Sequence, residues 1–389
     1  MTGYRYLIVG GGLAADAACR GIRERDTSGS IGLISEEQCG PYSRPLLSKG
    51  LWQGKSEAKL WRHTEDLGVS VHLGTAAQHL ELPAHRVVDA AGEVFEYERL
   101  LLATGASPAR LPFGGDEVIY FRTLDDYRRL RGLAGGGGRH TVIGGGFIGS
   151  EVAAALQTQG CEVAMVFPDA AIGARIFPAD LAAYVTGYYR ARGVEVFAGD
   201  TVTRLDRDDD SLRVQTGSGR AWDSAAVVAG IGVRPRTELA AAAGLPVDDG
   251  ILVDAFGRVP GQEDVFAAGD VARFPSAALG TMTRVEHEDH AISHGKAVGA
   301  NMAGAGVAYE HLPYFYSDLF DLGYEAVGEV TTAHETVADW QEPNRRGVIY
   351  YLDDGRVRGV LLWNTWDRVD AARDLIRSGE PFTKAARIG

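Results

Sequence analysis

The alternation of apolar runs, glycine clusters and alanine-rich stretches predicts the same local structure twice along the chain. Residues 4–9 are a short apolar run, followed by a glycine turn and an alanine-rich segment to residue 23, which predicts a strand and then a helix. The next apolar run, at residues 30–35, predicts a second strand with Glu36 at its end. Residues 139–169 repeat this order and close on Asp169. Two such units predict an α/β chain with two Rossmann-like, three-layer dinucleotide-binding domains.

The glycine spacing gives this pattern a chemical meaning. The G-x-G-x-x-G/A positions are Gly10, Gly12 and Ala15 in the first copy and Gly144, Gly146 and Gly149 in the second. In this motif the first glycine makes a tight turn, the second lets a pyrophosphate approach the backbone, and the third position is small where helix meets strand. The pyrophosphate then lies on N–H groups at the helix N-terminus. A carboxylate at the end of the second strand can accept hydrogen bonds from an adenosine ribose, so the sequence predicts two dinucleotide sites.

The segment between the copies predicts a helix with defined ends. Thr123 and Asp126 can form a capping box at its start. Four glycines at residues 135–138 are interpreted as an interdomain hinge.

From about residue 310 the sequence no longer follows the α/β pattern described above. Asp354 and Gly355 lie between two apolar runs, which predicts an antiparallel hairpin. An amphipathic helix is predicted after it, with Gly379 and Pro381 as its stop signals. An α+β C-terminal domain is therefore expected.

Composition narrows the class of protein. The 389 residues are 45% apolar and carry a net charge of −13, so no overall basic field would attract nucleic acid or anionic lipid. No apolar run is long enough to cross a bilayer, and the N-terminus does not read as a signal peptide. The three cysteines include no Cys-x-x-Cys pair. We expect a cytoplasmic protein that binds neither nucleic acid nor membrane.

Several segments together resemble a known family. They are "GGGLAA", "PYSRPLLSK", "LLATGASP", "RTLDD", "VIGGGFIGSE", "VFAAGDVA", "RVEHEDHA", "FYSDLFDLGYEAVG" and "GVLLWN". The chain resembles the FAD-dependent pyridine nucleotide oxidoreductases, in the branch of ferredoxin and rubredoxin reductases and apoptosis-inducing factor. The resemblance implies a split FAD-binding domain at 1–112 and 241–305, an NAD(P)H-binding domain at 113–240 and a C-terminal domain at 306–389.

The resemblance also implies roles in FAD binding. Arg44 would meet the FAD pyrophosphate, and Lys49 would lie near N5 of the isoalloxazine, where a cation stabilises the anion formed when a hydride arrives. Asp270 would hydrogen-bond the ribityl chain, and Glu286 and His287 would lie at the pyrimidine end of the flavin. Further cofactor-binding positions implied in this way are Ala77, Ala103, Thr104, Gly105, Gly232 and Gly269. The alternative for Arg44 and Lys49 is an ordinary solvated loop.

A second group of roles concerns the nicotinamide. By resemblance, Glu151 pairs with Lys49 and positions the nicotinamide amide, although its place in the first turn of a helix also suits a helix-dipole partner. Phe147 would shield the flavin face, or simply pack. Tyr316 aligns with an aromatic residue near the nicotinamide, and core packing is the alternative for it too.

The acid at the end of the second copy bears on the choice of nucleotide. Asp169 accepts hydrogen bonds from a 2′-hydroxyl and repels a 2′-phosphate, which favours NADH. Arg175, a few residues on, could instead allow NADPH.

Two further readings of the sequence stay open. His287, His290 and His294 fall on one face of a predicted helix and could bind zinc, or be ordinary helix residues. Cys39 lies where single-cysteine relatives carry a redox cysteine, but the arginine- and lysine-containing loop that follows it here is the version of the non-thiol members.

The resemblance leaves two functions. In the first, the chain is an enzyme that takes a hydride from NADH onto FAD and passes electrons to a small iron–sulfur protein, a [2Fe–2S] ferredoxin or rubredoxin. In the second, it is an NADH-responsive switch like apoptosis-inducing factor, in which a long-lived reduced flavin–NAD⁺ complex controls dimerisation or partner binding. Direct reduction of quinone, oxygen or a small organic molecule is a third possibility. The chain is expected to be a monomer or homodimer.

Overall fold

The computed structural model describes residues 2–208 and 211–389, and the chain divides into two compact units. Unit 1 comprises Met1–Ser43, Glu57–Ser107 and Arg234–Tyr314, and unit 2 comprises Arg44–Ser56, Pro108–Val233 and Phe315–Gly389. Each unit is therefore assembled from three separate stretches of chain. The division into three domains remains a prediction.

Unit 1 is built on a seven-stranded sheet with the order β3-β2-β1-β6-β5-β4, in which β18 also pairs with β6. Its strands are β1 (Thr2–Val9), β2 (Ile31–Ile34), β3 (Val69–His72), β4 (Ala77–Glu81), β5 (Arg86–Asp89), β6 (Val94–Leu102) and β18 (Val265–Ala267). The pairs β1–β2, β2–β3, β1–β6 and β6–β18 are parallel, whereas β4–β5–β6 is antiparallel. Carboxyl ends of β1, β2 and β6 therefore lie at one edge of the sheet, where a dinucleotide binds in such folds.

The alternation of side chains along β1 gives this sheet two buried faces. Tyr6 and Ile8 pack with residues of the helices α1 (Leu13–Arg23) and α7 (Glu288–Met302). Leu7 and Val9 point to the other face and pack with residues from 240–274. That second layer holds α6 (Glu238–Ala242) and the small sheet β17 (Ile251–Leu252), β19 (Ala272–Ser276) and β20 (Thr281–Thr283).

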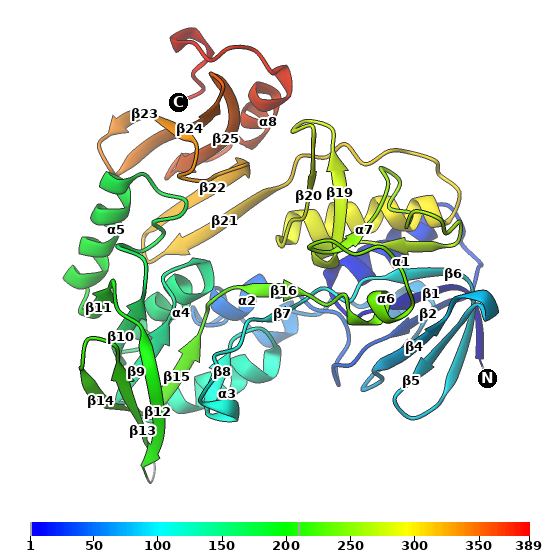
Figure 1. Ribbon diagram of the computed structural model, residues 1–389, viewed down its shortest axis with the longest axis horizontal. Helices are drawn as coiled ribbons and strands as arrows, with labels where there is room; N and C mark the ends of the chain where they lie inside the picture. Colours follow the sequence, from blue (N-terminus) through cyan, green and yellow to red (C-terminus); the bar gives the residue numbers. More distant parts are fainter. Residues whose placement is uncertain (1, 209–210) are drawn as a thin grey trace. The chain divides into compact units, whose positions relative to one another are not determined.

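Helices α1 and α7 lie against each other because glycines face the contact (Figure 1). A Cβ added to Gly295 would come within 2.3 Å of the Ala14 carbonyl oxygen, and one added to Gly299 within 2.2 Å of the Ala18 carbonyl oxygen. The first turns of α1 are thus fixed by backbone-to-backbone packing.

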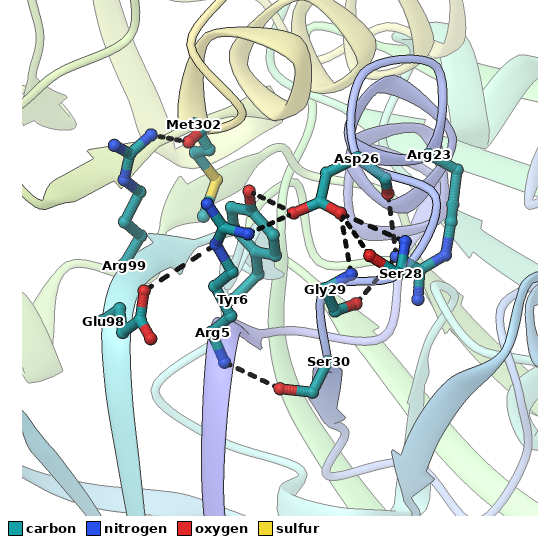
Figure 2. Close-up of polar contacts among 10 residues, drawn as sticks. All are labelled: Arg5, Tyr6, Arg23, Asp26, Ser28, Gly29, Ser30, Glu98, Arg99 and Met302. Atoms are coloured by element: carbon teal, nitrogen blue, oxygen red, sulfur yellow. Dashed lines mark hydrogen bonds and ion pairs between the residues drawn. The ribbon is translucent and has the colours of Figure 1, made fainter.

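A network around Asp26 fixes the connection from α1 to β2 (Figure 2). The Asp26 carboxylate accepts hydrogen bonds from the backbone N–H groups of Ser28 and Gly29, at 3.1 and 2.7 Å, and from the Tyr6 hydroxyl at 3.0 Å. Arg5 forms an ion pair with it at 2.8 Å. The two backbone N–H groups lower the pKa of Asp26 to about 2. Nearby, Arg23 donates to carbonyl oxygens and Arg99 to the Met302 carbonyl.

Unit 2 contains a second parallel sheet with the order β11-β10-β9-β15-β8. Its strands are β8 (Val118–Tyr120), β9 (Arg139–Ile143), β10 (Glu162–Phe167), β11 (Val194–Ala198) and β15 (Ala226–Ala229). The helices α3 (Leu124–Ala134), α4 (Phe147–Thr158) and α5 (Ala179–Ala191) pack against its strands. A three-stranded sheet of β12 (Val202–Asp208), β13 (Ser211–Thr216) and β14 (Ala221–Ser224) shares a hydrophobic core with it. The result is a second three-layer α/β fold.

Unit 2 also contains an antiparallel sheet with the order β21-β22-β25-β24-β23. Its strands are β21 (Tyr314–Leu319), β22 (Leu322–Gly328), β23 (Glu335–Glu342), β24 (Arg346–Asp353) and β25 (Arg356–Trp363). Helix α8 (Val369–Ser378) packs on β22 and β25. The predicted α+β C-terminal part is therefore present.

The remaining elements are short. They are α2 (Pro45–Ser48), the strands β7 (Ala106–Pro108) and β16 (Val233–Pro235), and the 3-10 turns η1 (Glu57–Lys59), η2 (Thr64–Leu67), η3 (Leu82–Ala84), η4 (Gly115–Glu117), η5 (Gly269–Val271) and η6 (Lys384–Ala386). Among the described residues, no helix is both long and apolar enough to cross a bilayer.

Several local predictions can be compared with this fold. The capping box is confirmed, because Asp126 N–H donates to the Thr123 hydroxyl at 3.2 Å and the Asp126 carboxylate accepts from Thr123 N–H at 2.8 Å. The hairpin is confirmed, with Asp354 and Gly355 at φ 48° and 70°. The interdomain hinge at residues 135–138 is wrong, since these glycines connect α3 to β9 inside unit 2.

Candidate active site: two glycine cradles and a buried Lys–Glu pair

The first glycine loop, Gly10–Ala15, joins β1 to α1 in unit 1. Gly10 has φ +132°, and a Cβ there would lie 2.0 Å from the Ala103 carbonyl oxygen. Gly12 has φ −93° and ψ −172°, which any residue can adopt, yet no atom lies within 4 Å of the position of its Cβ. Gly10 is thus required by the fold, whereas a side chain at Gly12 would fill open space that a pyrophosphate needs.

The second glycine loop, Gly144–Gly149, repeats this geometry in unit 2. A Cβ at Gly144 (φ +120°) would lie 2.3 Å from the Gly230 carbonyl oxygen. Gly146 again faces open space within 4 Å of its Cβ position. A Cβ at Gly149 would lie 2.2 Å from the Gly144 carbonyl oxygen, whereas the equivalent residue of the first loop, Ala15, carries a fully buried methyl group.

Both loops fit an anionic ligand electrostatically. Gly12 and Gly146 are the N-caps of α1 and α4, and neither has a side-chain capping hydrogen bond. The N–H groups in the first turn of a helix have no partner within the helix and lie at the positive end of its dipole. A pyrophosphate supplies the acceptors that these groups need.

The two predicted ribose-binding acids each lie two residues beyond their strand. Glu36 follows β2, and its carboxylate forms an ion pair with Arg236 at 2.5 Å. Asp169 follows β10 and lies 3.4 Å from the guanidinium of Arg175. Arg175, the candidate for NADPH binding, is itself mostly exposed and pairs with the acid that would exclude the phosphate.

Asp270 lies close to the first loop. It belongs to η5, where a Cβ at Gly269 (φ +74°) would lie 2.6 Å from the Cβ of Ala14 in the first turn of α1. The Asp270 side chain is buried, and its carbonyl oxygen accepts a hydrogen bond from Arg284 at 3.3 Å. Arg284 also donates to Glu286 at 2.5 Å. The structure therefore brings Asp270 and Glu286 together beside the first loop.

The histidines at the start of α7 have different surroundings. His287 is the N-cap of α7, whereas His290 and His294 are buried. The Nδ1 of His294 accepts the Gly269 N–H at 3.4 Å, and the Nδ1 of His290 lies 3.1 Å from the Tyr309 hydroxyl. Burial lowers the pKa of His294 to about 3 and that of His290 well below its usual value. Among the described residues, no group of three or more His, Cys, Asp or Glu side chains is placed to hold a metal ion.

The remaining unit 1 positions are placed as follows. Ala103, Thr104 and Gly105 follow β6, and the Thr104 hydroxyl donates to the Arg236 carbonyl oxygen at 2.8 Å. Ala77 begins β4 and packs against the core that contains Val9.

Unit 2 contains a buried ion pair at the start of α4. Lys49 Nζ lies 2.6 Å from Glu151 Oε1, and their side chains are 12% and 3% exposed. This is the pair that the resemblance implied. The ammonium also lies 4.9 Å from the centre of the Tyr316 ring. Two buried serines complete the group: Ser48 donates to Glu151 Oε2 and Ser317 to Glu151 Oε1, both at 2.6 Å.

The other unit 2 positions lie around this group or near the second loop. Phe147, the first residue of α4, is partly exposed and packs edge-on against Phe315, with 5.1 Å between the centres of the two rings. Gly232 has φ +103°, with open space around its Cβ position. Arg44 precedes α2 and donates to the Arg122 carbonyl oxygen at 3.2 Å.

Sequence reasoning missed Ser48 and Ser317, although both lie in segments that carry the family resemblance. A serine hydroxyl in a loop or a strand has no pattern of its own. Its spacing from Glu151, 103 and 166 residues respectively, gives no local signal either.

Two glycine loops, each joining a parallel strand to the helix that follows it in a three-layer α/β fold, define a class of oxidoreductase that binds two dinucleotides. The chain belongs to the pyridine nucleotide-disulphide oxidoreductase family, whose model matches residues 4–295. The model for the C-terminal region of mitochondrion-associated apoptosis-inducing factor matches residues 298–345 and 341–378. FAD and NAD(P)H are the cofactors typical of this family, so the prediction of an NAD(P)H-dependent flavoprotein oxidoreductase is confirmed.

Individual relatives span nearly the whole chain. Monodehydroascorbate reductase of Solanum lycopersicum is 33% identical, covering 92% of this chain and 90% of that protein. Apoptosis-inducing factor 1 of Dictyostelium discoideum is 31% identical, covering 96% of this chain and 78% of that protein. The crystal structure of a ferredoxin reductase from Rhodopseudomonas palustris superposes with a TM-score of 0.90 at 29% identity, covering 98% of this chain and 97% of that one.

Proposed function

We propose that this protein takes a hydride from NADH onto FAD and passes the electrons to an external acceptor, a small [2Fe–2S] ferredoxin or rubredoxin. The observation that carries the proposal is the presence of two glycine loops with open space beside them in a chain in which no disulfide joins Cys19, Cys39 or Cys161. Two dinucleotides can be held at once, and no cysteine pair receives the electrons internally.

Residues of unit 1 suit FAD. The first-turn N–H groups of α1 hold the pyrophosphate, Glu36 accepts from the ribose hydroxyls, and Asp270 accepts from the ribityl chain. FAD, when bound, accepts a hydride and releases electrons one at a time.

Residues of unit 2 suit NADH. The first turn of α4 holds its pyrophosphate, while Glu151 positions the amide of the nicotinamide. Asp169 accepts from the 2′-hydroxyl and repels a 2′-phosphate, so NADH is the preferred nucleotide. Lys49 carries the positive charge that the proposal assigns to N5 of the flavin.

The cysteines support an external acceptor. Cys19 and Cys161 are buried, and burial raises the pKa of both thiols, which keeps them protonated and unreactive. Cys39 is partly exposed and forms no disulfide. The likeness to a ferredoxin reductase supports an iron–sulfur protein as the acceptor.

Anaerobic stopped-flow kinetics tests the proposal. The purified protein with FAD is mixed with NADH and then with a [2Fe–2S] ferredoxin. We expect bleaching of the flavin absorbance, followed by fast reoxidation as the ferredoxin is reduced. NADPH in place of NADH should reduce the flavin at least tenfold less efficiently. Failure to bind FAD, or to be reduced by either nucleotide, would contradict the proposal.

A second function is favoured by the match of the C-terminal segment to apoptosis-inducing factor. In that function, NADH changes the surface of the protein and thereby its association with partners. The same experiment, followed by exposure of the sample to air, separates the two functions. A reduced protein that persists for minutes first with ferredoxin and then in air supports the switch. Monodehydroascorbate and a soluble quinone, used as acceptors in parallel, test for a small organic acceptor.

A further inference from the structure

We infer that Ser48 and Ser317 are positioning residues, which hold the Glu151 carboxylate and through it the Lys49 ammonium in one orientation. The inference rests on the proposed function, in which Lys49 and Glu151 face the reacting cofactors. It assigns to the C-terminal sheet a part in the nicotinamide site, because Ser317 lies on β21.

The hydrogen bonds occupy both oxygens of the carboxylate. Oε1 accepts from Ser317 and from Lys49, and Oε2 accepts from Ser48, all at 2.6 Å. Each partner is a donor toward Glu151, so the group is satisfied when Glu151 is an ionised acceptor. A carboxylate held at both oxygens cannot rotate about its last bond without breaking a short hydrogen bond.

Burial makes these hydrogen bonds matter. Glu151, Ser48 and Ser317 are all less than a tenth exposed, so water cannot replace a lost hydroxyl. A buried carboxylate with one ammonium partner lacks the further donors that a buried charge requires. The two hydroxyls supply those donors without adding a second positive charge that would compete with Lys49.

Other ionisable groups lie near the Glu151 carboxylate, but they do not supply the hydrogen bonds that the two serines donate to it. Tyr189 and Tyr324 are buried, and burial, followed by the charge of Glu151, raises the pKa of both phenols. Burial also raises the pKa of Asp318, where Lys49 and Lys55 act to lower it and Glu151 to raise it. These groups surround Glu151, but the short side-chain hydrogen bonds to its oxygens come from Lys49 and the two serines.

Three elements far apart in sequence meet at this carboxylate. Ser48 ends α2, Glu151 lies in the first turns of α4, and Ser317 lies on β21. Each serine therefore holds the Glu151 carboxylate from a different element of the fold. Removing one hydroxyl should loosen the pair, and removing both should release it.

Four variants test the inference: Ser48→Ala, Ser317→Ala, the double variant, and Ser317→Thr, which keeps a hydroxyl. The matched control is Ser224→Ala, since Ser224 is a buried serine of unit 2 whose hydroxyl donates to the Ala226 carbonyl oxygen and not to Glu151. All proteins are prepared with FAD, and their unfolding midpoints are compared first.

The first readout is the rate constant of flavin reduction at saturating NADH, with the dissociation constant of NADH measured separately. We expect a fall of about tenfold for each single serine variant and about a hundredfold for the double variant, because each change removes one hydrogen bond to a buried charge. The dissociation constant should change less than threefold. Ser317→Thr should recover most of the rate, and the control should match the wild type.

The second readout does not depend on activity. Labelling of Lys49 by a small amine-reactive reagent, followed by mass spectrometry, should be several-fold faster in the double variant than in the wild type. Wild-type labelling and wild-type reduction rates in a double variant that unfolds normally would overturn the inference. If the wild-type protein is not reduced by NADH, the proposed function fails, while faster labelling of Lys49 would still support the positioning role.

Discussion

In each dinucleotide fold, the helix that follows the glycine loop carries a buried carboxylate, but the two carboxylates have different partners. Asp16 in α1 accepts from Arg20, Arg62 and Thr64, at 2.9 to 3.0 Å. Glu151 in α4 accepts from a lysine and two serines. Asp16 is fully buried and Glu151 nearly so.

The difference follows from one position along the helix. Asp16 comes six residues after Gly10, whereas Glu151 comes seven residues after Gly144. At 3.6 residues per turn, one residue rotates a side chain by about 100° around the helix axis. Asp16 therefore faces the 62–64 segment, and Glu151 faces Lys49 and β21. Guanidinium forks lock the first carboxylate into the fold, while the second holds an ammonium that can still act on a ligand.

The largest effect should come from placing a side chain in the open space of one glycine loop at a time. Gly12 and Gly146 have extended backbone angles and open space, so Gly12→Val and Gly146→Val should both fold. Gly12→Val should yield protein without FAD. Gly146→Val should keep FAD but raise the KM for NADH at least about a hundredfold, by loss of several charge-assisted hydrogen bonds. Flavin absorbance and reduction kinetics measure the two effects, and loss of FAD from Gly146→Val would contradict the assignment.

The next effect concerns the buried pair of unit 2. Glu151→Gln keeps the shape of the side chain but removes the charge that orients Lys49. We expect reduction by NADH to slow by about 10²-fold with FAD still bound, since a misplaced catalytic group costs about that much. Lys49→Met should act in the same direction. Stopped-flow reduction checks both variants, and an unchanged rate in Glu151→Gln would rule out its role.

Asp16→Asn should give the opposite pattern, with altered stability rather than altered chemistry. The asparagine amide has one acceptor oxygen where the carboxylate has two, so it cannot accept at both positions from Arg20 and Arg62 as Asp16 does. We expect a destabilisation of roughly 2 kcal/mol, in the range for lost hydrogen bonds to a charged group. Urea unfolding of the protein with FAD measures it. The reduction rate per bound flavin should stay within about threefold of the wild type. A larger loss of rate would contradict the purely structural role that distinguishes Asp16 from Glu151.

The smallest effect should be seen at Asp26, which holds the turn before β2. Its pKa in the folded protein, about 2, is below its value in the unfolded chain, so Asp26 stabilises the fold above about pH 4 and loses that contribution as pH falls toward 2. Asp26→Asn should lower the unfolding midpoint by a few degrees at pH 7, with the difference shrinking in acid. Because the wild type and the variant share the buried His290 and His294, the acid sensitivity of these residues cancels in the comparison.

The sequence predicts the two glycine loops well because the residues that each loop requires lie close together in the chain. Glycine at positions 10 and 144 is required by a turn, and the strand and helix on either side have their own periodicity. The capping box of Thr123 and Asp126 and the hairpin at Asp354 are local in the same sense.

Features that depend on distant partners could not be predicted from the residues alone. The four glycines at 135–138 resemble a hinge, but only the fold shows that α3 and β9 belong to the same compact unit. His290 and His294 share a helix face that suits a metal, yet the residue that completes their surroundings, Tyr309, lies beyond the end of the helix. Ser317 reaches Glu151 only because β21 passes the start of α4.

The five crossings of the chain between the units have a consequence for its biosynthesis. The sheet of unit 1 is complete only when β18 has paired with β6, so it cannot close before about two thirds of the chain has left the ribosome. Unit 2 begins with Arg44–Ser56 and needs residues after Tyr314. Unit 1 needs residues up to Tyr314 and unit 2 needs the segment after it, so neither unit can finish folding early in synthesis. The long-range pairings of both units favour slow folding. Nascent chains should therefore depend on protection from aggregation until synthesis is nearly complete, and no simple truncation yields either unit alone.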